Sequence, residues 1–186
     1  MDCELLAGAP RVAPAPHGVV VRLRAFTAAD APLVQEASMD RSVARMTPVP
    51  ANGSVEAALA FIERQRARSG SRDGYSFAIA DLDDSAVGQI ALRPRDDGTG
   101  TASVSYWIRR SSRLRGYGAA ALAALVEWAA RIPQLRTLEL VVEPGNEGSW
   151  RIAESVGFER EPWMLHRADP DDDRQSLVVY ALPLAG

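Results

Sequence analysis

An arginine-rich loop that ends in two glycines is the first stretch of this sequence whose residue types and spacing suggest chemistry. It reads Ser105-Tyr-Trp-Ile-Arg-Arg-Ser-Ser-Arg113-Leu-Arg115-Gly116-Tyr117-Gly118-Ala119. Glycines let the backbone approach a ligand closely, and a helix N-terminus offers free N–H groups and partial positive charge. Arginine adds donors for phosphate oxygens. The stretch therefore predicts a pyrophosphate cradle, with a plain helix start as the alternative.

The two best-known phosphate motifs do not fit this loop. The chain contains no lysine, and no third glycine stands at the required spacing. The loop therefore matches neither the P-loop nor the dinucleotide-binding fingerprint. The absence of lysine also excludes Schiff-base chemistry.

A second stretch supplies a serine on a short amphipathic helix. It reads Glu143-Pro-Gly-Asn146-Glu-Gly-Ser149-Trp-Arg-Ile-Ala-Glu-Ser-Val156-Gly157-Phe158. Ser149 shares a helix face with Ile152, Ala153 and Val156, so its hydroxyl should point towards the core. One alternative is a serine that caps its own helix start. For Asn146, the alternative is an ordinary turn residue after Pro-Gly.

Together, the two stretches resemble the GCN5-related N-acetyltransferase superfamily. Arg113-X-X-Gly116-X-Gly118-Ala119 looks like its pyrophosphate-binding motif. Pro144-X-Asn146-X-X-Ser149, followed by Gly157-Phe158, looks like its next strand–helix motif. Tyr106-Trp107 and the Asn-X-X-Ser form are similar to the branch that acetylates ribosomal protein N-termini. The resemblance covers about residues 20 to 183.

This resemblance implies a role for each matching residue, with acetyl-coenzyme A as cosubstrate and no metal. The residues implied to hold the coenzyme pyrophosphate are Arg113, Leu114, Arg115, Gly116, Tyr117, Gly118 and Ala119. Trp107 and Ile108, at a strand end, would pair with the pantetheine arm, and Asn146 would hydrogen-bond to it. Ser149 would be the catalytic residue, close to the thioester sulfur, where it protonates or hydrogen-bonds the departing thiolate.

The sequence departs from the superfamily at the general base. Members often carry a glutamate on the strand before the arginine-rich loop, whereas the inward candidates here are Ser103 and Ser105. We therefore expect water or a remote carboxylate to deprotonate the incoming ammonium.

The elements around these stretches follow from hydrophobic periodicity and turn residues. Strands are expected at 19–26, 75–80, 87–92, 102–108, 137–142, 162–167 and 176–182. Helices are expected at 31–37, at 54–68, over a long segment ended by Pro133, and at 147–156. This order predicts a mixed α/β fold, with a mostly antiparallel sheet and one parallel strand–helix–strand crossover. We expect residues 1–18 to form a flexible arm and residues 19–186 a single domain.

Composition narrows the class of protein. Hydrophobic residues make up 47% of the chain, but no apolar run approaches the roughly 20 residues of a membrane span. The net charge of −3 provides no overall basic footprint for nucleic acid. The chain has one cysteine, Cys3, and two histidines, His17 and His166, so we expect neither an internal disulfide nor a histidine-rich metal site. Together with the lack of a secretory signal, this predicts a cytoplasmic protein.

The resemblance thus implies an N-acetyltransferase, and we expect it to work in a ternary complex, as a monomer or homodimer. The expected acceptor is the amine of a protein or peptide N-terminus. Two alternatives are an aminoglycoside or other small amine, which the acidic run at 169–173 could attract, and a non-catalytic acyl-coenzyme A sensor. The loop 46–53 and the helix after it, with Arg64, Arg66 and Arg68, are the expected acceptor walls.

Overall fold

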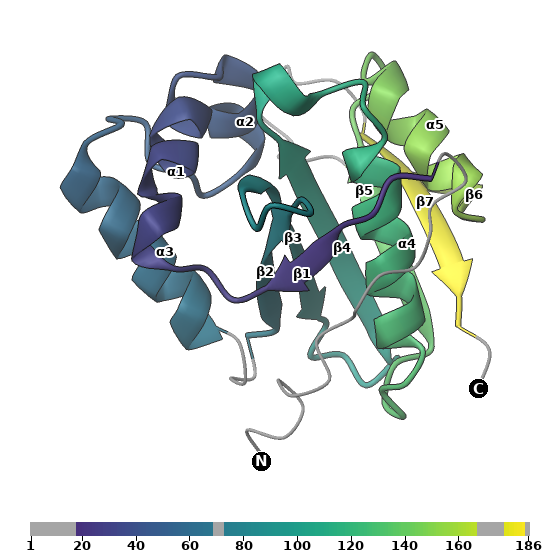
Figure 1. Ribbon diagram of the computed structural model, residues 1–186. Coiled ribbons are helices and arrows are strands. Elements are labelled where there is room, and N and C mark those ends of the chain that lie inside the picture. Colours follow the sequence, from purple (N-terminus) through teal and green to yellow (C-terminus); the bar gives the residue numbers. More distant parts are fainter. Residues whose placement is uncertain (1–17, 69–72, 167–176, 185–186) are drawn as a thin grey trace.

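One seven-stranded sheet with helices on both faces forms the framework of the chain (Figure 1). The computed structural model describes residues 18–68, 73–166 and 177–184. The strands are β1 (Arg22–Arg24), β2 (Tyr75–Ala80), β3 (Ala86–Pro94), β4 (Thr101–Ile108), β5 (Thr137–Val142), β6 (Glu159–His166) and β7 (Leu177–Pro183). The helices are α1 (Ala31–Ser38), α2 (Arg41–Met46), α3 (Val55–Arg68), α4 (Tyr117–Ala129) and α5 (Glu147–Ser155), and 3-10 turns cover Ala28–Asp30 and Arg110–Ser112.

The strand order, β1-β2-β3-β4-β5-β7-β6, confirms the predicted mixed sheet. β4 and β5 pair in parallel, and all other neighbouring pairs are antiparallel. The connection between the two parallel strands runs through α4, because parallel neighbours need a crossover. β7 enters the sheet between β5 and β6, so the edge strand on that side is β6.

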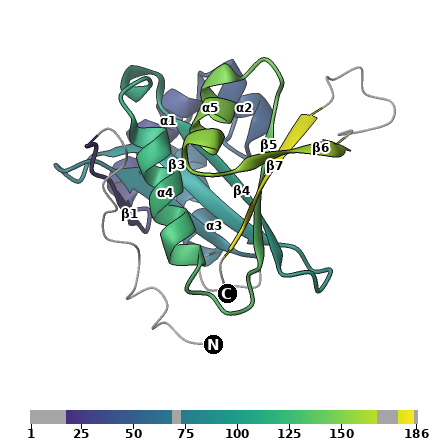
Figure 2. The same ribbon diagram turned by 90° about the vertical axis from the view of Figure 1, so that its right-hand side faces the viewer.

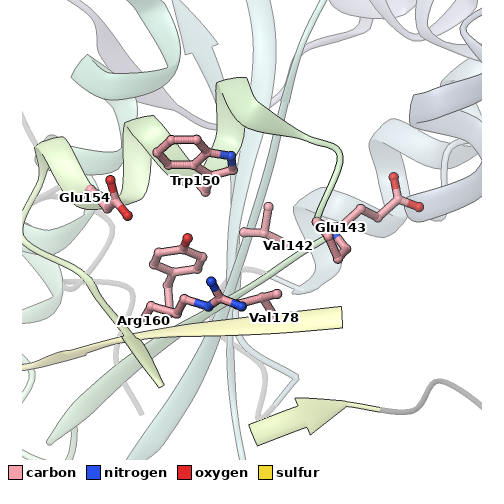
Figure 3. Close-up of a pocket in the computed structure, with 8 residues that line it drawn as sticks. Val142, Glu143, Trp150, Glu154, Arg160 and Val178 are labelled. Carbon is pink, nitrogen blue, oxygen red and sulfur yellow. The ribbon is translucent and has the colours of Figure 1, made fainter. Parts of the chain in front are cut away.

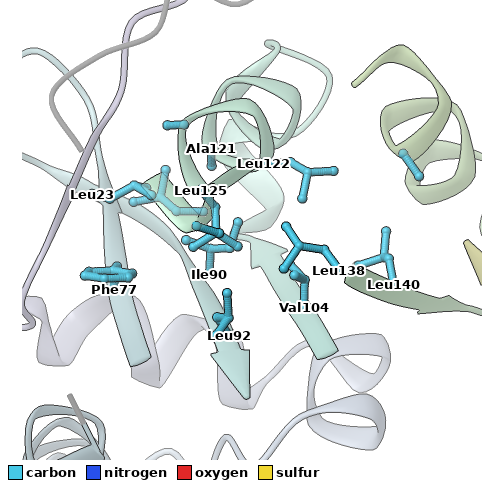
Figure 4. Close-up of a cluster of buried hydrophobic side chains, with 14 of the residues drawn as sticks. Leu23, Phe77, Ile90, Leu92, Val104, Ala121, Leu122, Leu125, Leu138 and Leu140 are labelled. Carbon is cyan, nitrogen blue, oxygen red and sulfur yellow. The ribbon is translucent and has the colours of Figure 1, made fainter. Parts of the chain in front are cut away.

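The main hydrophobic core lies between the sheet and α4 (Figure 4). Side chains of a strand alternate between the two faces, and Val104, Leu138 and Leu140 all point towards this helix. Leu122 and Leu125 of α4 are fully buried against them, as the predicted helical stripe requires. α5 lies beside α4 on the same face (Figure 2).

The opposite face is covered by α1 and α3, and the short helix α2 lies between these two in the chain. The sequence did not predict α2, because Val43 is its only buried side chain and six residues carry little periodicity. Its start is fixed instead by Asp40, whose carboxylate accepts the Ser42 N–H at 3.0 Å.

The predicted bounds of β2 and β5 match the structure, whereas β1 is shorter than predicted and begins at Arg22. The residues before β1 leave the sheet and reach the start of α4. A Cβ atom built on Gly116 would lie 3.0 Å from Val19 Cγ2. The chain before β1 therefore packs against the loop in which the sequence predicts the pyrophosphate cradle.

Candidate active site

The parallel strands β4 and β5 separate at their C-terminal ends. They pair from Thr101–Thr137 only as far as Val104–Leu140, although β4 continues to Ile108 and β5 to Val142. Arg109 N–H donates to Val87 C=O on β3, so the odd-numbered residues of β4 direct their backbone groups to β3. Beyond Val104, the backbone groups of Tyr106 and Ile108 therefore face β5 without a ladder partner.

The start of α4 presents free N–H groups beside this separation. The first backbone bond of the helix runs from Ala120 N–H to Gly116 C=O at 3.0 Å. Within the described residues, the N–H groups of Tyr117, Gly118 and Ala119 have no backbone acceptor. Gly116 adopts a φ of 84°, and the preceding Leu114 adopts 59°. The loop can therefore offer several N–H groups to one anion.

Leu114 combines a left-handed backbone with an exposed side chain. Its relative exposure is 103%, so no packing contact explains the strained conformation. Non-glycine residues in this region are uncommon, and such strain clusters at functional sites. Leu114 is among the residues implied to hold the pyrophosphate, and its exposed side chain indicates that burial does not set the loop conformation.

Arg113 connects the end of β4 to the start of α2. Its Nε donates to Ile108 C=O at 2.9 Å, and its guanidinium forms an ion pair with Asp40 at the start of α2. Burial raises the pKa of Asp40, but hydrogen bonds from Ser42 and the charge of Arg113 hold that pKa below its ordinary value. Arg113 thus joins β4, the cradle loop and α2, and its charge is already paired.

Arg115 has a different environment from Arg113. Its guanidinium carbon lies 5.8 Å from the centre of the Tyr117 ring, and within the described part of the chain it has no ion-pair partner. Of the two arginines predicted to bind phosphate, Arg115 is therefore the one whose charge is free for a ligand.

The Tyr106 hydroxyl and the Ser149 hydroxyl meet across the separated strands, at 3.1 Å. Tyr106 projects from β4 on the α4 side, and Ser149 lies in the first turn of α5. Burial raises the pKa of Tyr106, with a smaller opposing effect from the bond to Ser149, so the phenol is neutral at ordinary pH. Ser149 could be identified from the sequence, but its partner could not, because 43 residues separate the two positions.

Asn146 caps α5 and thereby positions Ser149. Its side-chain oxygen accepts the Ser149 N–H at 3.2 Å, and its backbone carbonyl accepts the same N–H at 3.0 Å. Asn146 is exposed, so its side-chain N–H₂ group can still reach a ligand.

Trp107 and Gly118 are both buried. The Trp107 indole donates to Gln89 Oε1 at 2.7 Å, and its backbone groups face β3. A Cβ atom on Gly118 would lie 3.0 Å from Ile152 Cδ1 and 3.3 Å from Tyr106 Cε2. Gly118 therefore lets α4 pack against the two side chains that frame Ser149, which is a structural reason for glycine besides ligand approach.

Carboxylates near the ends of β4 and β5 are candidates for the general base, because serines stand where the superfamily often carries a glutamate. Ser103 and Ser105 lie on the same face of β4 as Trp107, and their hydroxyls are weak bases. Glu139 is buried opposite Ser103 and is paired with Arg95, near the far end of β4. Glu143 follows β5 directly, at the open end of the strands, and pairs with Arg45 of α2.

Two hollows flank the separated strands. One, of about 330 Å³, lies between α5 and the strands β5, β7 and β6 (Figure 3). In Figure 3, Trp150 forms one wall, Arg160 lies opposite, and Glu143 points away from both. The other, of about 640 Å³, lies on the α2 side, and its lining residues are Glu36, Ala37, Met39, Asp40, Arg41, Val43, Arg109, Arg110 and Arg113.

Several predicted features lie outside the described residues: the arm up to residue 17 with Cys3, and the acidic run at 169–173. Among the residues that are described, no group of three or more His, Cys, Asp or Glu side chains could hold a metal. No helix in the described ranges is long and apolar enough to cross a membrane.

Comparison with known proteins places this geometry in a family. The family model of the acetyltransferase (GNAT) domain matches residues 21–159, a range that contains both site stretches. A search of curated protein sequences found no match.

Solved structures share the fold over nearly the whole chain. A Vibrio cholerae protein with a proposed ribosomal-protein-serine acetyltransferase activity superposes with a TM-score of 0.72 at 25% identity, over 94% of this chain and 97% of that one. Mycobacterium smegmatis RimJ, solved with a CoA disulfide, gives 0.75 at 24% identity, over 95% and 86%. The microcin C7 self-immunity acetyltransferase MccE, solved with acetyl-CoA and AMP, gives 0.74 at 15% identity, over 88% and 92%. The chain belongs to the GNAT family of acetyltransferases.

Proposed function

We propose that this acetyltransferase moves the acetyl group of acetyl-CoA to the α-amine at the N-terminus of a protein or peptide, by direct attack within a ternary complex. The observation that carries the reaction is the separation of β4 and β5 beside the free N–H groups of α4. A linear cosubstrate can pair with the open edge of β4 while its pyrophosphate binds the helix start.

The residues present fit such a donor. The N–H groups of Tyr117, Gly118 and Ala119 and the free charge of Arg115 suit the pyrophosphate. The unpaired backbone groups of Tyr106 and the N–H of Ile108 suit an amide-bearing arm. Asn146 can donate to the same arm from the side of α5. These assignments retain the predicted cradle but give Arg113 the role of holding the loop, since its charge is paired with Asp40.

The proton transfers follow from the hydroxyl pair. The neutral amine attacks the thioester carbonyl carbon, the carbonyl electrons move to oxygen, and their return breaks the carbon–sulfur bond. The departing thiolate takes a hydrogen bond or a proton from Ser149, backed by the neutral phenol of Tyr106 at 3.1 Å. The nitrogen loses two protons overall: one leaves before attack, and the other leaves after attack and reaches sulfur directly or by replacing the proton that Ser149 has donated, so the serine ends neutral.

The first of these protons needs an acceptor, and Glu143 is our candidate. It lies at the open end of β5, where it forms an ion pair with Arg45 of α2. Arg45 is half-exposed, so an incoming ammonium can take its place on Glu143. Water would serve the same role if the acceptor amine is already largely neutral.

Two observations favour an α-amine over a lysine side chain as the acceptor: its pKa, and the similarity of this chain to a solved structure. An α-amino group has a pKa near 8, about two units below that of lysine, so a larger fraction is neutral at pH 7. A site whose base is a paired surface carboxylate suits such an acceptor. The similarity to the Vibrio cholerae protein with proposed ribosomal-protein-serine acetyltransferase activity supports the same choice.

A competition assay tests this acceptor. Short peptides with free N-termini, N-terminally blocked peptides that contain lysine, and aminoglycosides are offered together with acetyl-CoA, and products are resolved by mass spectrometry. We expect the free N-termini to be acetylated first. Preferential acetylation of aminoglycosides or of blocked lysine peptides would reject the N-terminal acceptor, and binding of acetyl-CoA without turnover of any amine would favour a sensor.

A further inference from the structure

The hollow on the α2 side carries more positive charge than its own residues neutralise. Four arginines line it, and only two carboxylates accompany them. Asp40 pairs with Arg113, and Glu36 lies 4.0 Å from Arg109. Both carboxylates are therefore already paired with arginines of the hollow.

Arg41 and Arg110 remain with their charges free. Both are exposed, they come from α2 and from the turn before α4, and within the described ranges neither has an ion-pair partner. The floor between them is apolar, since Ala37 and Val43 are buried there. Two free guanidinium groups around one concave space are suited to a carboxylate or phosphate.

The hollow is also within reach of the reaction. α2 runs from Arg41 at the hollow to Arg45, which pairs with Glu143 at the end of β5. Four residues of helix span about 6 Å. Arg113 joins the hollow to Ile108 C=O on β4. A molecule whose amine reaches Glu143 can therefore extend its other end along α2 into the hollow.

We propose that this hollow binds an anionic group, a carboxylate or a phosphate, carried by the acceptor about one helical turn from the reacting amine. This inference rests on amine acetylation as the function, and it deepens that function by naming the acceptor class. The volume of about 640 Å³ admits a peptide side chain or a small organic acid.

The test compares matched acceptors that differ only in charge. Amidated four-residue peptides with a free N-terminus carry asparagine, aspartate or phosphoserine at the third position, and 4-aminobutyrate is compared with its amide. We expect the wild-type kcat/KM to favour the anionic member by about tenfold, the lower end for charged hydrogen bonds, because the hollow is open to solvent. The aspartate and phosphoserine arms distinguish a carboxylate from a phosphate ligand.

The double variant Arg41→Gln/Arg110→Gln should lose this preference. Its kcat/KM for the neutral acceptors and its KM for acetyl-CoA should equal those of the wild type. The control Arg131→Gln/Arg136→Gln removes the same charge from exposed positions outside the hollow and should keep the preference. The proposal would be overturned if the wild type did not prefer the anionic acceptors, or if both double variants preferred them equally. A raised KM for acetyl-CoA in Arg41→Gln/Arg110→Gln would also overturn it. If only 4-aminobutyrate and its amide react and the preference follows the arginines, the peptide acceptor fails while the anion site stands.

Discussion

Removing the hydroxyl of Ser149 is the sharpest test of the reaction geometry. The hydroxyl lies 3.1 Å from Tyr106 Oη, and both groups are neutral at ordinary pH. Thiols are far more acidic than a serine hydroxyl, with a pKa near 8.5 for a cysteine side chain, so Ser149 contributes mainly a hydrogen bond to the thiolate. Hydrogen bonds to charged groups contribute about 1.5–3 kcal/mol, or roughly 10- to 150-fold in rate.

For Ser149→Ala we expect kcat to fall about tenfold, the lower end of that range, because Tyr106 or a water molecule can replace the lost donor. Tyr106→Phe alone should have a smaller effect. The double variant should lower kcat by about a hundredfold, more than the product of the two single effects, because no donor then remains.

The assay follows release of the coenzyme thiol for kcat and calorimetric titration for the dissociation constant of acetyl-CoA. Ser155→Ala is the matched control, since its hydroxyl lies on the same helix and bonds to the Ile152 carbonyl at 2.8 Å. An equal loss in kcat and in affinity for acetyl-CoA would refute a transition-state role and make Ser149 a binding residue. Purely additive single effects would refute the partnership with Tyr106.

The remaining predictions concern two carboxylates. Glu143→Gln should lower kcat/KM at pH 7 by about a hundredfold, the low end for a lost general base, and the loss should shrink above pH 8 as the α-amine becomes neutral in solution. Glu147→Gln, on α5, is the control. If Glu143→Gln leaves the pH profile of kcat/KM unchanged, water and not Glu143 accepts the proton. Burial raises the pKa of Asp30, but the bonds from Arg24 and Thr27 hold it below the ordinary 3.8, so its stabilising charge is present above that value and lost as the pH falls through the lower folded pKa. Asp30→Asn should therefore lower the free energy of unfolding by about 3 kcal/mol at pH 7, measured by urea unfolding, and by less below pH 3.8. The control Asp84→Asn, at an exposed carboxylate, should lower it by under about 1 kcal/mol. Equal losses in the two variants would show that the buried ion pair of Asp30 adds no extra stability.

Local sequence patterns were sufficient to predict most of the helices and strands. β2 and β5 occupy the predicted residues because alternation and turn residues mark both strands clearly. The helical stripe of α4 is buried as predicted, and the face of α5 that carries Ser149 also carries Ala153, which is fully buried. These features depend on neighbours within a few residues, which is the range that periodicity can report.

The sequence alone also showed serines where the superfamily often carries a glutamate, the absence of lysine, and an arginine-rich loop before a helix. It could not determine which arginine remains free. Arg113 and Arg115 look equivalent in the loop, but only the packing of α2 brings Asp40 to Arg113 and leaves Arg115 without an ion pair among the described residues.

Tertiary structure decided every contact between distant segments. β7 lies between β5 and β6, β4 separates from β5 after Val104, and the Tyr106 and Ser149 hydroxyls meet although the two residues are 43 positions apart in the chain. Glu143, directly after β5, forms an ion pair with Arg45, which is 98 residues away in the chain. Strand order and strand separation arise from packing the whole sheet between two helical layers, and no local pattern encodes them.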